Sequence, residues 1–62
     1  MQELKNGVDL KVMRIKSGVK AIDVAISLGW SPSKLSLIEN GRTKARPELL
    51  AEIRETITRL AR

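Results

Sequence analysis

Three basic side chains, Arg42, Lys44 and Arg46, lie within five positions of one another. They belong to a chain of 62 residues in which twelve Lys and Arg face seven Asp and Glu, giving a formal net charge of +5. So large a positive charge on so small a body attracts polyanions. The pattern predicts a binding site for a phosphate-bearing polymer, and the alternative is a basic surface without a ligand.

Residue types that catalyse reactions or bind metals are scarce. The chain contains no cysteine and no histidine, so thiolate and imidazole ligands and the usual proton carriers at neutral pH are missing. No nucleophile paired with a base and no glycine-rich phosphate loop is recognisable. We therefore expect no enzymatic activity, no metal and no cofactor.

Glycine and proline divide the chain into four helical segments within a single domain, residues 1–62. Strand patterns are weak because no alternating run of β-branched residues occurs. Serine or asparagine before a helix, proline at its first position and glycine after its end mark the boundaries. The expected helices are about Gly7–Ser17 capped by Asn6, about Ala21–Leu28 closed by Gly29, Pro32–Glu39 capped by Ser31, and a last helix from Pro47.

Apolar residues three and four positions apart give each of these helices one face that can be buried. The expected core residues are Leu10 and Met13, then Val24, Ala25 and Leu28, and then Leu35 and Ile38, while Leu50, Ile53, Ile57 and Leu60 share one face of the last helix. The fold class predicted is all-α, a compact bundle of four helices.

The two short helices on either side of Gly29, about residues 20–40, have the form of a helix-turn-helix unit. From Val19 to Ile57 the chain resembles the Cro and phage-repressor family of DNA-binding domains. The matching segments are Val24-Ala25, Leu28-Gly29-Trp30-Ser31, Lys34-Leu35-Ser36 and Ile38-Glu39-Asn40-Gly41. The resemblance implies a lambda-repressor-like domain of four or five helices.

The resemblance also implies roles for individual residues. Arg14 would form a structural ion pair with Glu39, and Trp30 would lie in the core, with base stacking as its alternative. Base reading in the major groove would come from the outer face of the second helix of the unit: Pro32, Ser33, Lys34, Ser36 and Leu37. Phosphate contacts would come from Lys20, Asn40, Arg42, Lys44 and Arg46.

Two features depart from the family pattern. Lys20-Ala21 stands where the family commonly has a Ser or Thr cap followed by a glutamine that contacts the DNA backbone. Apolar residues also form extra stripes, namely Val8, Val12 and Ile15, and then Ile22 and Ile26. Either the helices pack in a rotated arrangement that buries part of these stripes, or a second protein surface covers them. The predicted interface residues are Val12, Ile15, Ile22, Ile26, Ile57 and Leu60.

We therefore expect a sequence-specific transcriptional regulator of the repressor type that binds double-stranded DNA, as a homodimer on a palindromic operator. The alternative is a protein-interaction module or antiactivator on the same fold, with another regulatory protein as its partner. The polar start and the absence of an apolar run of about 20 residues predict no signal peptide and no membrane span. The expected location is the cytoplasm, in association with the nucleoid when DNA is bound.

Overall fold

The computed structural model describes residues 6–61, and these form four α-helices without strands. The helices are α1 (Gly7–Lys16), α2 (Ala21–Leu28), α3 (Pro32–Glu39) and α4 (Pro47–Leu60). The bounds agree with the sequence prediction, except that α1 ends one residue earlier and Ser17 is its C-cap. The all-α fold class is confirmed.

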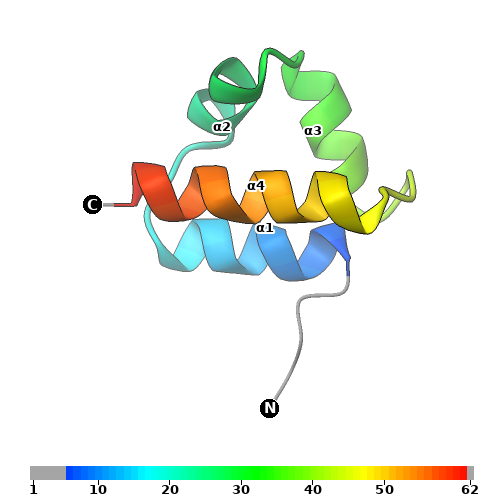
Figure 1. Ribbon diagram of the computed structural model, residues 1–62, viewed down its shortest axis with the longest axis horizontal. Helices are drawn as coiled ribbons and strands as arrows, with labels where there is room; N and C mark the ends of the chain where they lie inside the picture. The colour runs from blue at the N-terminus through cyan, green and yellow to red at the C-terminus, as the bar shows by residue number, and fades with distance from the viewer. Residues whose placement is uncertain (1–5, 62) are drawn as a thin grey trace.

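Helices α1 and α4 lie side by side and run in the same direction, and α2 and α3 pack across them (Figure 1). Helix α1 contacts α3 and α4, while α2 contacts α3 and α4. The buried apolar residues at the centre are Leu10, Val19, Val24, Ala25, Leu35, Ile38, Ile53 and Ile57. Within residues 6–61, no helix is both long and apolar enough to cross a membrane.

Local signals account for where α1 begins. The Asn6 side chain accepts a hydrogen bond from the Asp9 amide at 3.1 Å, as an N-cap does. The next residue, Gly7, is buried, and a Cβ atom placed there would overlap the carbonyl oxygen of Ile38. Glycine at this position therefore lets the first turn of α1 pack directly against the end of α3.

Candidate nucleic-acid interface

The turn between α2 and α3 sets the direction in which α3 points. Gly29 takes the left-handed conformation, with φ of 72°, and the amide of Trp30 donates to the carbonyl of Ala25 at 2.9 Å. The Ser31 hydroxyl then accepts from the Lys34 amide at 3.3 Å, and Pro32 occupies the first position of the helix. Because only glycine adopts positive φ without strain, this sequence fixes a sharp corner before α3.

Helix α3 buries one side and leaves the other open. Leu35, Ile38 and Glu39 face the core, each at most 3% exposed. All five of the predicted base-reading residues are exposed, namely Pro32, Ser33, Lys34, Ser36 and Leu37. The open face is small and chemically simple, with two hydroxyl groups, one ammonium group, one proline ring and one leucine side chain.

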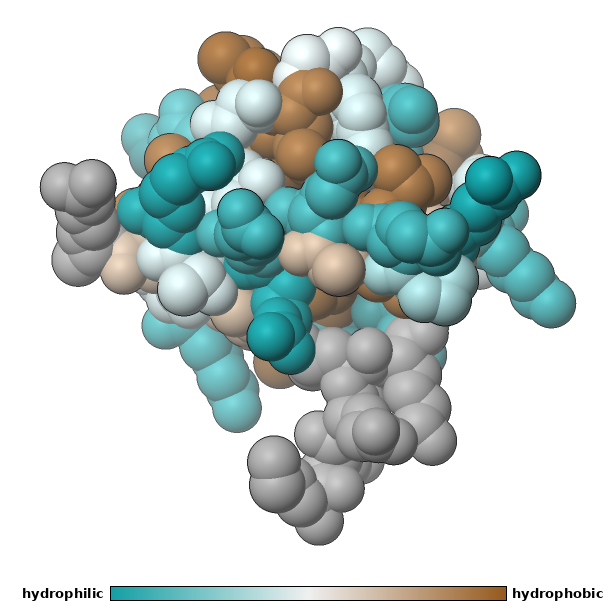
Figure 2. All heavy atoms as spheres, viewed as in Figure 1, coloured by the Kyte–Doolittle hydropathy of each residue, from teal (hydrophilic) through white to brown (hydrophobic). Residues whose placement is uncertain are grey.

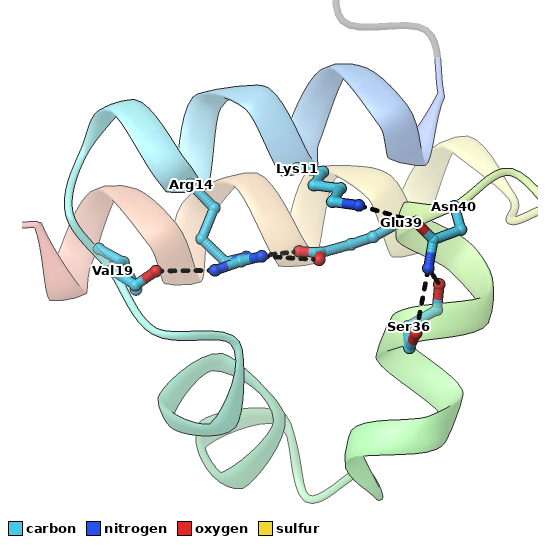
Figure 3. Close-up of polar contacts among 6 residues, drawn as sticks. All are labelled: Lys11, Arg14, Val19, Ser36, Glu39 and Asn40. Atoms are coloured by element: carbon cyan, nitrogen blue, oxygen red, sulfur yellow. Dashed lines mark hydrogen bonds and ion pairs between the residues drawn. The ribbon is translucent and has the colours of Figure 1, made fainter.

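Glu39, the acidic residue of α3, is buried in an ion pair. Arg14 Nε lies 2.8 Å from Glu39 Oε2, and Arg14 Nη2 donates to Oε1 at 3.1 Å, so the pair is bidentate (Figure 3). The third bond of the guanidinium, from Nη1, goes to the carbonyl of Val19 at 2.9 Å. One arginine of α1 thus joins the end of α3 to the segment between α1 and α2.

A second connection from α1 reaches the end of α3. Lys11 Nζ donates to Asn40 Oδ1 at 2.8 Å, and Asn40 Nδ2 donates both to the carbonyl of Ser36 at 2.9 Å and to its hydroxyl oxygen at 3.1 Å (Figure 3). Lys11 is not among the site residues predicted from the sequence. Its position one turn before Arg14 was a usable signal, because residues three apart share a helix face.

The predicted phosphate contacts are exposed as well. Lys20 precedes α2 and makes no side-chain cap, while Arg42, Lys44 and Arg46 lie in the segment between α3 and α4. That segment folds back on α3, because the amides of Arg42 and Thr43 both donate to the Leu37 carbonyl, at 2.9 and 3.3 Å. The loop cations are therefore tied to the carboxyl end of the same helix.

Residues 24–47 expose positive charge alone. They contain four cationic side chains and a single acid, Glu39, which is buried against Arg14. The four cations are Lys34, Arg42, Lys44 and Arg46. A polyanion that approaches this surface meets no exposed carboxylate from these residues.

Trp30 is half-buried and packs against the core, as the sequence predicted. The Lys34 ammonium lies 4.4 Å from the ring centroid, which is cation–π geometry. Lys34 also follows the amino end of α3, where a cation is disfavoured by the helix dipole. The ring of Trp30 offsets that cost by offering the ammonium an electron-rich face.

The extra apolar stripes are not buried by a rotated packing. Val12 is 47% exposed, Ile15 60%, Ile22 45% and Ile26 68%, and Figure 2 shows hydrophobic side chains gathered over α2. The prediction that Ile57 belongs to an interface is wrong: this residue is fully buried, because α4 turns Ile53 and Ile57 toward the core. Leu60, near the end of α4, is 37% exposed.

Among residues 6–61, no cluster of three acidic side chains is arranged to hold a metal ion. The turn at Gly29, the open face of α3 and the cations beside it define the class of protein, a DNA-binding helix-turn-helix domain. Residues 7–62 match the helix-turn-helix domain family, which is related to the Cro-type domains, and the chain belongs to that family. Members of such families are typically not enzymes. No curated protein and no solved structure is significantly similar to the chain.

Proposed function

We propose that this chain is a sequence-specific, repressor-like transcriptional regulator that inserts α3 into the major groove of DNA. The observation that supports this most strongly is the absence of any exposed acid between residues 24 and 47, around the outward face of α3. DNA carries one phosphate charge for about every 1.7 Å of its axis, so an acid-free surface of this kind matches it.

Different side chains position the domain on the DNA backbone and read the base edges. Lys20, Asn40, Arg42, Lys44 and Arg46 contact phosphates and fix the register of the domain on the duplex. Ser33, Ser36 and Lys34 offer hydrogen-bond donors to base edges, and Pro32 and Leu37 offer apolar contact, for example to a thymine methyl group. Because single hydroxyl groups discriminate weakly between bases, one domain has modest specificity.

A homodimer compensates for this modest specificity. Two copies related by a two-fold axis place their α3 helices about one turn of DNA apart and double the contacts on a palindromic site. The exposed apolar residues Val12, Ile15, Ile22, Ile26 and Leu60 are the candidates for the surface between the copies. Repression is then steric, since the bound dimer occupies the operator.

Selection from a pool of random duplexes at low salt, followed by a mobility-shift assay, tests the proposal. We expect enrichment of a palindromic sequence. The variant Leu37→Glu places an acid on the open face of α3 and should abolish binding of that sequence. The matched control, Arg54→Glu, changes charge at an exposed position of α4 and should retain the sequence preference. If no sequence is enriched by the unaltered protein, the proposal is wrong.

The exposed isoleucines of α2 favour a second candidate, a protein-interaction module on the same fold. Ile22 and Ile26 are one turn apart and 45% and 68% exposed, and exposed apolar patches of this kind mark partner surfaces. The double variant Ile22→Glu/Ile26→Glu separates the two candidates. DNA binding that persists while a regulatory partner is lost supports the interaction module; loss of operator binding with loss of the dimer supports the regulator.

A further inference from the structure

The contact between Lys11 and Asn40 bears on how α3 reads DNA, and the argument rests on the proposed function. Asn40 follows the last residue of α3 and is exposed. An exposed amide in such a place exchanges its hydrogen bonds with water. Here the amide oxygen instead accepts from the Lys11 ammonium at 2.8 Å, which is the length of a charge-assisted hydrogen bond.

Electrostatics strengthen this contact. The carboxyl end of a helix attracts cations, because its last carbonyl groups point outward with partial negative charge. Helix α3 has no basic residue of its own in its last turn. Lys11 of α1 supplies that cation from another helix, so its ammonium is held at the end of α3 by both the carbonyl dipoles and the Asn40 oxygen.

The hydrogen bonds of Asn40 fix the polarity of its neighbour. An asparagine amide group has two N–H donors. The amide nitrogen can only donate, and it lies within hydrogen-bonding distance of two oxygens of Ser36, 2.9 Å from the carbonyl oxygen and 3.1 Å from the hydroxyl oxygen. The Ser36 hydroxyl therefore accepts from Asn40, and its own hydrogen is turned away from the amide and remains free to donate.

We propose that Lys11 is a specificity-determining positioning residue, which holds the Asn40 amide so that Ser36 meets the major groove as a hydrogen-bond donor. A donor at this position favours base edges that present an acceptor, namely guanine O6, thymine O4 and the N7 atom of either purine, over the amino groups of adenine and cytosine. Lys11 thus shapes base choice without touching a base.

Three variants test this in the selection from random duplexes. Ser36→Ala removes the donor, and Lys11→Met removes the ammonium but keeps the unbranched stem. Both should weaken the preference at the same base pair of each half-site by about 2- to 10-fold, the effect of one neutral hydrogen bond, and leave the other positions unchanged. Lys11→Arg should restore the preference, because a guanidinium can also donate to Asn40 Oδ1.

Lys16→Met is the matched control, because Lys16 is an exposed lysine of the same helix. It removes the same charge and should leave every base preference intact. If Lys11→Met weakens binding to all sequences equally, as the loss of a plain phosphate contact would, the positioning role is wrong while the proposed function stands. If the unaltered protein selects no sequence, the proposed function fails first and the positioning role with it.

A measurement on the free protein gives an independent check. By NMR, the side-chain amide protons of Asn40 should exchange slowly with water in the unaltered protein and in the Lys16→Met variant. They should exchange faster in Lys11→Met, with unchanged thermal unfolding. Equal exchange rates in the two lysine variants would overturn the proposal.

Discussion

At the scale of single residues, Arg14 joins parts of the chain that are far apart in the sequence. Its guanidinium joins the Glu39 carboxylate in α3 to the Val19 carbonyl before α2. The side chains of Arg14 and Glu39 are only 12% and 4% exposed. Removing one partner of such a pair costs far more than the pair itself contributes, because a buried charge is left alone.

We therefore expect Arg14→Met to lower the free energy of unfolding by about 3 kcal/mol or more, measured by urea denaturation. The double variant Arg14→Met/Glu39→Met should recover much of the loss, since it leaves no buried charge. Arg54→Met, at an exposed position of α4, is the control and should change stability by less than about 0.5 kcal/mol. A double variant as unstable as the single one would show that the ion pair itself provides the stability.

The contact between Trp30 and Lys34 leads to an optical prediction. Trp30 is the single tryptophan of the chain, and the Lys34 ammonium lies over its ring. A bound phosphate or base edge that engages Lys34 should draw the ammonium from the ring and change the fluorescence of Trp30. Lys34→Met should show the altered fluorescence before DNA is added and little further change on binding. An identical change of fluorescence on DNA binding in both proteins would show that Lys34 does not contact the DNA.

At the scale of helices, the packing of α1 on α3 depends on Gly7. Alanine is the better helix former by about 1 kcal/mol, so helix propensity alone favours Gly7→Ala. The added Cβ would overlap the carbonyl oxygen of Ile38, however, and a backbone atom cannot rotate away. Overpacking of this kind typically costs about 1–3 kcal/mol.

The net effect of Gly7→Ala should therefore be a loss of stability, seen as a lower midpoint of thermal unfolding. Ser27→Ala measures the effect of helix propensity alone, because Ser27 lies at an exposed position of α2. This variant should stabilise the protein slightly. If Gly7→Ala also stabilises the protein, the ends of α1 and α3 are not in direct contact.

Asn6 and Gly7 differ in how much of their structural role the sequence predicts. Asn6, Gly29 and Ser31 act on atoms within a few residues of themselves, so their types predicted the helix ends and the corner before α3. The close approach of Gly7 to the Ile38 carbonyl depends on how two helices meet, and no local pattern encodes it. For the same reason, periodicity placed Ile57 on an apolar face but did not tell whether the core or a partner covers that face. The open face of α3 was predictable because the family resemblance supplied the missing packing.

At the scale of the whole molecule, the acid-free segment and the apolar stripe of α1 belong to different parts of the chain. The acid-free segment surrounds α3, whereas the stripe of Val8, Val12 and Ile15 lies on the side of α1 opposite to Leu10, which is buried. A protein built in this way can meet a polyanion with one surface while another remains open to a second copy. Ionic strength can distinguish one bound copy from two, because each neutralised phosphate adds to the salt dependence.

Four cations per chain, Lys20, Arg42, Lys44 and Arg46, are the proposed phosphate contacts. The logarithm of the binding constant should fall with the logarithm of salt concentration with a slope of about −3.6 for one copy and about −7 for two. Fluorescence anisotropy of labelled operator DNA at increasing KCl measures this slope. Arg42→Gln should reduce its magnitude by about 0.9 per bound copy, whereas Arg59→Gln, in the last turn of α4, should leave it unchanged. A slope near zero in the unaltered protein would contradict phosphate binding by these side chains, and a slope of about −3.6 on the full palindrome would contradict the homodimer.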